Sequence, residues 1–209
     1  MLALQSVSIT FENSSQITCD VALSAGDICA ITGPSGVGKS TLLLALAGFR
    51  GLDGGDVTWD GQSFMAQPIW SRPLSLLFQS DNLFGHLSAR RNISLGAQKT
   101  AKKHEIGRKI DEIASKLHIS SILDKACSAL SGGQQQRVGL ARALVAEKPI
   151  LLLDEPFSAL DDENRQKALA LVKEITAEHN LVTLIVTHDK SDIAALGAQE
   201  LRLQRQPLR

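Results

Sequence analysis

Residues 33–40, GPSGVGKS, combine three glycines with a lysine and hydroxyl side chains. Glycine allows backbone angles that other residues avoid, so successive N–H groups can turn inward around anionic oxygens. The Lys39 ammonium can reach phosphate oxygens as a point charge, and the Ser40 hydroxyl can ligate Mg²⁺. The spacing G-x-x-x-x-G-K-[ST] therefore predicts a nucleoside triphosphate site, and a merely flexible loop is the alternative.

A strand and a helix have to hold this loop. Residues 28–31 form a short apolar run typical of a buried strand, and apolar residues recur with helical spacing over 42–47. The start of a helix adds partial positive charge to the loop. We therefore expect nucleotide contacts along the whole turn, at Gly33, Pro34, Ser35, Gly36, Val37, Gly38, Lys39, Ser40 and Thr41.

Two adjacent carboxylates follow another apolar run, in ILLLDEP at residues 150–156. In an α/β fold the ligand crevice lies at the carboxyl ends of the strands, so both acids are expected there. Asp154 is a natural partner for the Mg²⁺ that Ser40 would hold, and Glu155 could polarise an attacking water. Two solvated acids at a strand end are the alternative.

Two further polar residues close apolar runs. His188, in VTHD, follows the run 181–186 and could contact a γ-phosphate and position water, although a lone histidine at a strand end is more often structural. Gln79 closes LSLLFQ and could contact the metal or the water. We expect both side chains in the crevice that holds Asp154 and Glu155.

A second glycine-rich helix start occurs in LSGGQ at residues 130–134. Ser131, Gly132 and Gly133 present a hydroxyl and backbone N–H groups at the positive end of an apolar helix. A second anion cradle implies a second ligand, or the same nucleotide approached from another chain. Ser131 as a plain N-cap, paired with Gln134 in a capping box, is compatible with either interpretation.

Length, charge balance and cysteine content limit the kinds of protein that this chain can be. The 209 residues suggest one domain, or one domain with an embedded subdomain. Basic and acidic residues balance at 22 each, which argues against nucleic acid as an electrostatic partner. The sequence shows neither a signal peptide pattern nor an apolar run near the ~18 residues that span a bilayer. The scattered cysteines 19, 29 and 127 are expected to be reduced cytosolic thiols.

The pattern of runs predicts a layered α/β fold. Residues 3–11, 16–23 and 56–59 alternate in polarity or are rich in β-branched residues, which indicates an antiparallel N-terminal layer. The apolar runs 28–31, 150–153 and 181–186 are typical of strands buried on both faces of a parallel sheet. Helical periodicity over 101–117 and 134–147 predicts a helical insert between them.

Taken in order, residues 33–40, Gln79, LSGGQ, LLLDE, SALD at 158–161 and His188 resemble the motif set of ATP-binding cassette proteins. The resemblance implies a P-loop NTPase (RecA-like) core with a parallel sheet, an N-terminal antiparallel β layer and an inserted helical subdomain. It implies one cassette over 1–209, with a core subdomain at 1–79 and 149–209 and a helical subdomain at 80–148.

The resemblance also implies ATP and Mg²⁺ as cofactors and a head-to-tail homodimer enclosing two ATP molecules. On this analogy Ser131, Gly133 and Gln134 act on the partner's nucleotide, Asp161 couples the two sites, and Glu155 is the general base. Phe11 is the candidate for stacking on adenine. Many members have tyrosine there, whereas this chain has none, and ordinary core packing of Phe11 is the alternative.

Residues 80–96 resemble the region of bacterial importer ATPases that docks on a coupling helix of an integral membrane permease. Leu83, Phe84 and Leu87 would then be partly exposed hydrophobic contacts, or they pack under their own helix. The expected partners are permease subunits and, indirectly, a periplasmic or extracytoplasmic solute-binding protein. The expected location is the cytoplasmic face of the inner membrane.

The segments 71–96 and 130–145 are most similar to thiamine-importing members, so thiamine is the expected solute, with iron, sulfate, molybdate and polyamines as alternatives. By comparison with relatives, the tail RLQRQPLR is expected to stop before a last strand and helix. Two other classes remain open. A soluble cassette ATPase usually has tandem cassettes, coiled coils or basic arms, and an ordinary kinase or switch would leave LSGGQ and SALD unexplained.

Overall fold

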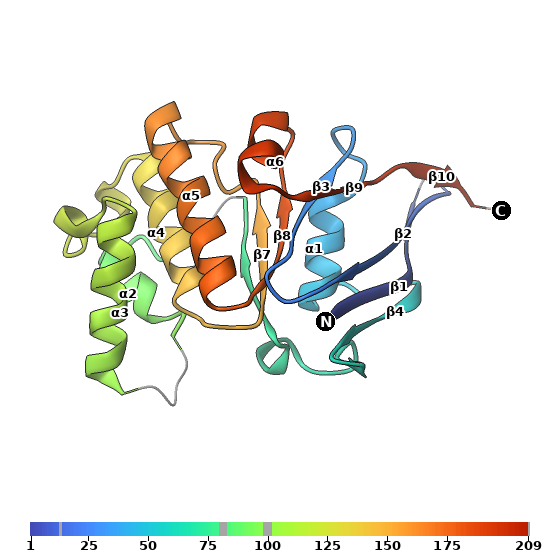
Figure 1. The fold of residues 1–209 in the computed structure, drawn as a ribbon, viewed down its shortest axis with the longest axis horizontal. Coiled ribbons are helices and arrows are strands. Elements are labelled where there is room, and N and C mark those ends of the chain that lie inside the picture. The colour runs from blue at the N-terminus through green and yellow to red at the C-terminus, as the bar shows by residue number, and fades with distance from the viewer. Residues whose placement is uncertain (13, 80–82, 98–101, 209) are drawn as a thin grey trace.

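The computed structural model describes residues 1–12, 14–79, 83–97 and 102–208 (Figure 1). It confirms the predicted α/β fold with two separate sheets. The first sheet has the order β10-β2-β1-β4-β5, and every pairing in it is antiparallel. Its strands are β1 (Leu2–Phe11), β2 (Ser15–Leu23), β4 (Gly54–Trp59), β5 (Gln62–Ser63) and β10 (Arg205–Pro207).

The second sheet has the order β6-β7-β8-β3-β9, and every pairing in it is parallel. Its strands are β3 (Ile28–Thr32), β6 (Leu74–Leu77), β7 (Ile150–Asp154), β8 (Val182–Val186) and β9 (Gln199–Arg202). The three central strands are buried along almost their whole length, as continuous apolar runs in a parallel sheet require. The buried parallel strands predicted at 28–31, 150–153 and 181–186 are thereby confirmed, with Leu181 just outside the third.

The parallel sheet separates two hydrophobic clusters because successive side chains of a strand point to opposite faces. Ala30, Leu151 and Ile185 face one cluster, and their neighbours in the same strands face the other. Helix α1 (Lys39–Ala47) lies between the two sheets, whereas α4 (Gly132–Leu144) and α5 (Asp162–Glu178) cover the opposite face (Figure 1). From Leu42 onward helix α1 is apolar on all sides, which suits this enclosed position.

The segment between β6 and β7 is mainly helical. It contains α2 (Ala89–Ser94), α3 (Lys103–Lys116), α4, and short 3₁₀ turns at Ser120–Ile122 and Cys127–Ala129. The helix predicted at 101–117 is observed as α3, and residue 101 lies outside the described residues. The helix predicted at 134–147 begins earlier, at Gly132, and ends earlier, at Leu144. The expected subdomain limit at residue 80 also falls outside the described residues, so this division stays a proposal.

The end of the described chain adds a strand to each sheet. A third 3₁₀ turn (Ile69–Ser71) and helix α6 (Lys190–Leu196) complete the list of elements. After α6, β9 extends the parallel sheet beside β3, and β10 then pairs antiparallel with β2 at the edge of the other sheet. The tail thus contributes a strand that the sequence analysis did not anticipate, and it ties the two sheets together.

The described helices include none that is both long and apolar enough to cross a membrane. All three cysteines are free and buried. Burial raises the pKa of Cys19 to about 11 and that of Cys29 to about 12, so both thiols are protonated at neutral pH. These thiols act as small apolar core residues.

Candidate functional site

The strand order assembles the predicted site at one edge of the parallel sheet. Strands β7, β8 and β3 are neighbours, so their carboxyl ends lie side by side. The 33–40 loop follows β3, Asp154 ends β7, and His188 comes two residues after β8. Gln79 comes two residues after β6, the next strand along. Motifs distant in sequence therefore meet in the crevice expected of an α/β sheet.

The phosphate loop has the backbone conformation that its glycines allow. Gly38, the residue before α1, has φ +119°, and a Cβ there would lie 2.6 Å from Cζ of Phe11. Gly36 has φ +73°, and a Cβ there would meet open space. The loop is thus closed against Phe11 on one side and open on the other, where an anion could enter. Pro34, Ser35, Val37 and Thr41 lie in the same turn.

Lys39 occupies the inside of this loop. Its ammonium donates to the carbonyl oxygens of Gly33 at 3.0 Å and Pro34 at 3.1 Å. An ammonium has three donors, and within the described part of the chain these two carbonyls are its only hydrogen-bond acceptors. The remaining donor is available to a phosphate oxygen.

Ser40 and Asp154 form the candidate metal site. The Ser40 hydroxyl donates to Oδ1 of Asp154 at 3.0 Å, although the two residues are 114 positions apart. Asp154 is 7% exposed, and burial raises its pKa while the hydrogen bond from Ser40 opposes that rise. A buried carboxylate beside a hydroxyl is a favourable place for a hard cation, because both groups offer oxygen ligands.

The described residues contain no cluster of three or more His, Cys, Asp or Glu side chains that could hold a metal by themselves. This donor set suits Mg²⁺, which is usually bound through one or two carboxylates together with phosphate oxygens and waters. The residues present therefore fit a cation that arrives with a nucleotide. They do not form a complete protein cage.

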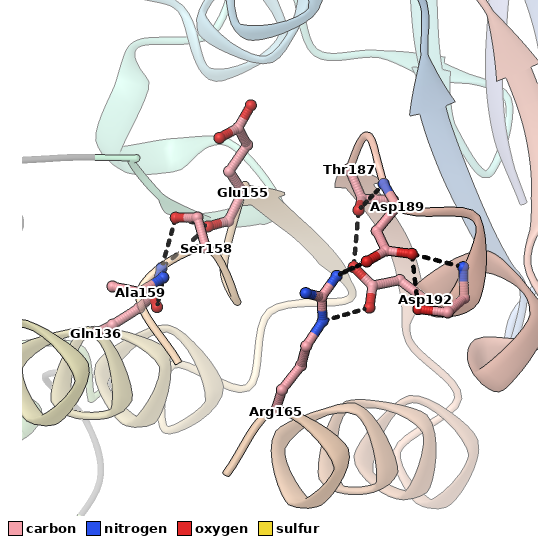
Figure 2. Close-up of polar contacts among 9 residues, drawn as sticks. Gln136, Glu155, Ser158, Ala159, Arg165, Thr187, Asp189 and Asp192 are labelled. Carbon is pink, nitrogen blue, oxygen red and sulfur yellow. Dashed lines mark hydrogen bonds and ion pairs between the residues drawn. The ribbon is translucent and has the colours of Figure 1, made fainter. Parts of the chain in front are cut away.

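Glu155 and Gln79 are hydrogen-bonded to each other. Nε2 of Gln79 donates to Oε2 of Glu155 at 2.9 Å. Glu155 has φ +46°, in the left-handed region that side-chain-bearing residues rarely adopt. Figure 2 shows its carboxylate directed away from Ser158 and Ala159. The structure thus places Gln79 beside Glu155, and its expected contact with the metal or the water stays a prediction.

His188 shares a small cavity of ≈ 90 Å³ with Glu155. The two residues that flank the histidine are both anchored. The Thr187 hydroxyl donates to Asp192 at 2.8 Å, and the Asp189 carboxylate accepts from the backbone and hydroxyl of Ser191 at the start of α6. The His188 loop is therefore held in place from both sides.

Arg165 of α5 secures this loop, and the sequence analysis did not identify it. Its guanidinium donates twice to Asp192, at 2.9 Å each, and once to Asp189 at 2.6 Å (Figure 2). The two carboxylates raise the pKa of Arg165, Asp192 most strongly. Because the partners are 24 and 27 positions away, no local motif signalled the pairing.

The second glycine-rich turn forms the capping box that was considered for it. The Ser131 hydroxyl accepts from the Gln134 backbone N–H at 3.3 Å, and the Gln134 side chain accepts from the Ser131 N–H at 3.1 Å. Gly132 and Gly133 form the first turn of α4. No hydrogen bond or ion pair in the described residues joins 131–134 to the 33–40 loop of the same chain.

Asp161 is the N-cap of α5. It accepts from the Asn164 backbone at 2.9 Å and from its side chain at 2.7 Å. These hydrogen bonds lower the pKa of Asp161, so the carboxylate is charged at neutral pH. The cap places a charged residue at the exposed end of the SALD segment.

Phe11 is half-buried beside the phosphate loop and lies under two arginines. The Arg205 guanidinium carbon is 4.1 Å from the ring centroid and that of Arg50 is 5.4 Å away. Arg205 also donates to the carbonyl oxygens of Gly36 at 2.7 Å and Val37 at 3.3 Å. Strand β10 thus brings a cation to the expected base-stacking residue, a contact that the sequence analysis missed.

The three apolar residues considered for permease docking differ in their exposure. Phe84 is 52% exposed, whereas Leu83 is half-buried against the helical core and Leu87 is also half-buried. Of these three residues, Phe84 alone is mostly exposed to solvent, and Leu83 packs against its own segment.

The chain is similar to known proteins in sequence and in fold. The ABC transporter family matches residues 18–158. The thiamine import ATP-binding protein ThiQ of Vibrio parahaemolyticus is 43% identical over 95% of this chain and 85% of its own length. The ThiQ protein of Salmonella choleraesuis is 44% identical over 87% of this chain and 77% of its own length.

Two solved structures have the same fold. The dimeric structure of MJ0796, a bacterial ABC transporter cassette, has a TM-score of 0.85 at 28% identity, covering 100% of this chain and 99% of the other. The post-hydrolysis dimer of the same cassette with ADP and Pi has a TM-score of 0.84 at the same identity and coverage.

Proposed function

The chain belongs to the ABC transporter family, and we propose that it is the ATP-hydrolysing subunit of a bacterial importer whose solute is thiamine. The observation that best supports the ATPase site is the pairing of Ser40 with Asp154 beside that of Gln79 with Glu155. Phosphate-loop, metal and water-activating groups thus occupy one sheet edge. Membership of this family also argues against the kinase and switch alternatives.

The residues at the edge of the parallel sheet, together with Phe11 of β1, bind different parts of Mg·ATP. Loop N–H groups and Lys39 bind the phosphates of ATP, which lowers the cost of negative charge on the transferring group. Ser40 and Asp154 would hold Mg²⁺, which neutralises phosphate charge when bound. Phe11 stacks on the base. The catalytic constellation thereby positions the γ-phosphate toward the ends of β7 and β8.

Glu155 acts as the general base. Its carboxylate accepts a proton from the attacking water, and the Gln79 amide holds it through Oε2, leaving the other oxygen for the water. His188 lines the same cavity as Glu155 and contacts a γ-phosphate oxygen. The left-handed backbone at Glu155 turns its side chain out of the strand direction, so Asp154 and Glu155 can serve different atoms.

Two chains act together. Ser131, Gly132, Gly133 and Gln134 contact the nucleotide bound to the partner's phosphate loop, and Asp161 lies near the seam between the two sites. The dimeric MJ0796 structures support this arrangement by their similarity. ATP makes contacts in the closed dimer that it lacks in the open one, and this difference in affinity drives closure.

Closure moves a permease. The cassette binds integral membrane permease subunits at the cytoplasmic face of the inner membrane, and a solute-binding protein delivers thiamine on the other side. The thiamine assignment rests on the names of relatives at 43–44% identity. The ATPase chemistry itself is common to importers of other solutes.

Affinity purification of this chain from its native membranes in mild detergent tests the transport role. We expect mass spectrometry to identify a multi-span permease, and the assembled complex in vesicles to accumulate thiamine when ATP is inside. Accumulation of another solute would contradict thiamine alone. Recovery with soluble partners only would contradict the importer role.

A further inference from the structure

Gln136 of α4 forms three hydrogen bonds to the segment that follows the proposed general base. Its Nε2 donates to the backbone oxygen of Glu155 at 3.0 Å and to Oγ of Ser158 at 3.2 Å. Its Oε1 accepts from the backbone N–H of Ala159 at 2.9 Å (Figure 2). We propose that Gln136 is a positioning residue that links the LSGGQ turn of a subunit to the general base of the same subunit.

The chemistry requires an amide at this position. Two donors and one acceptor on a single side chain match two oxygens and one N–H of the 155–159 segment. Glutamate would keep the acceptor and lose both donors, and leucine would lose all three interactions. Ser158 completes the set because its hydroxyl also donates to the Glu155 oxygen at 3.1 Å.

The first turn of α4 packs closely against the backbone of residues 155–159. A Cβ on Gly133 would lie 3.0 Å from the carbonyl oxygen of Ala159, so the first turn of α4 approaches the 155–159 segment more closely than a larger residue would allow. The side chain of Gln136 then fixes the same segment one turn further along the helix. Helix α4 and this segment are therefore expected to move as one unit.

The link acts on a strained residue. Glu155 has φ +46°, a conformation that persists only when surrounding contacts determine it. Its backbone N–H donates to the Val186 oxygen at 3.1 Å, and its own oxygen accepts from Gln136. The peptide groups on both sides of the Glu155 side chain are thus held, one by β8 and one by α4.

This inference rests on the proposed function. In the dimer, the LSGGQ turn of one subunit contacts the partner's nucleotide, while Glu155 of the same subunit serves its own. A displacement of α4 by the partner's nucleotide would reach Glu155 through Gln136. The structure thereby suggests how the two ATP sites influence each other within one chain.

The neighbouring Gln135 offers a matched control. It lies in the same helix and is also half-buried, and its amide donates to the backbone oxygens of Cys127 at 3.0 Å and Leu130 at 3.2 Å. Gln135→Leu therefore removes a similar number of hydrogen bonds without touching the 155–159 segment. The loss of a half-buried amide from α4 is common to both variants.

The test compares Gln136→Leu, Gln136→Glu and Gln135→Leu by steady-state ATP hydrolysis and by nucleotide affinity in the monomeric state. For both Gln136 variants we expect kcat to fall at least ~10-fold and the Hill coefficient for ATP to approach 1, with monomer affinity unchanged within about twofold. Gln135→Leu, which loses its bond to the Leu130 oxygen of the LSGGQ turn, should lower kcat less than either Gln136 variant and keep a Hill coefficient above theirs.

Two results would overturn the inference. One is a Gln136→Glu variant whose kcat and Hill coefficient match those of Gln135→Leu, and the other is loss of monomer nucleotide affinity along with kcat. An inactive wild-type protein would instead contradict the proposed function itself. A cooperative thermal unfolding transition shows that each variant is folded. If Gln136→Leu does not fold, the comparison of Gln136→Glu with Gln135→Leu still tests the inference.

Discussion

Replacing Arg165 by methionine should destabilise the protein strongly, because Arg165 is paired with a buried carboxylate. Asp192 is 1% exposed and receives two hydrogen bonds from this guanidinium. Methionine keeps most of the side-chain volume and removes the charge. The variant therefore leaves a buried carboxylate without its cation.

The size of the effect follows from the remaining contacts. Removing one partner of a buried ion pair typically costs about 3–5 kcal/mol. The Thr187 hydroxyl still donates to Asp192 at 2.8 Å, so the loss should be near the lower limit, about 3 kcal/mol. The bond to Asp189 adds little, because that side chain is 35% exposed and screened by solvent.

Urea unfolding followed by circular dichroism measures this loss. The double variant Arg165→Met/Asp192→Leu removes the unpaired charge and should recover about 2 kcal/mol, since apolar replacement of a buried pair is often neutral. A loss below about 1 kcal/mol for the single variant would refute the reasoning. A double variant no more stable than the single variant would refute it as well.

Three other changes test the site. Ser131→Arg should abolish hydrolysis while leaving monomer nucleotide affinity unchanged; loss of that affinity would place Ser131 at its own chain's nucleotide. Burial raises the pKa of Asp154 above 3.8, so its stabilising contribution is present at lower pH and lost as pH rises through the folded pKa. Asp154→Asn should therefore keep or raise the melting temperature at pH 7 without nucleotide and lose the extra stabilisation by Mg·ATP; a lower melting temperature would contradict this. Phe11→Ala should weaken ATP binding by about 1–3 kcal/mol in calorimetry and weaken tripolyphosphate binding less, whereas equal effects on both would exclude base stacking.

The sequence predicts the sheet and the groups at its edge because these signals are local. Continuous apolar runs mark the buried parallel strands, and residues 33–40 combine every feature of a phosphate loop within one turn. The capping box at Ser131 and Gln134 is likewise visible within four residues. Parallel pairing then brings the polar residue after each strand to the same edge.

The contacts that hold the site are not local, and the sequence did not reveal them. Arg165 pairs with Asp192 across 27 positions, and Arg205 reaches the Gly36 oxygen across 169. Charged residues are common on solvated surfaces, so the residue type alone does not show which charged residue is paired or with what. The hydrogen bond from Gln79 to Glu155 spans 76 positions and is equally invisible in the sequence, and the expected contact of Gln79 with the metal or the water stays a prediction.

In the proposed mechanism two copies of this chain close around ATP, and hydrolysis with Glu155 as the base ends the closed state. The most direct test is the mass of Glu155→Gln in solution, measured by light scattering with and without saturating ATP. We predict one chain mass of 22.4 kDa without nucleotide and twice that mass with ATP, together with loss of hydrolysis. A variant that stays at one chain mass with ATP, or that hydrolyses ATP at the wild-type rate, would contradict the account.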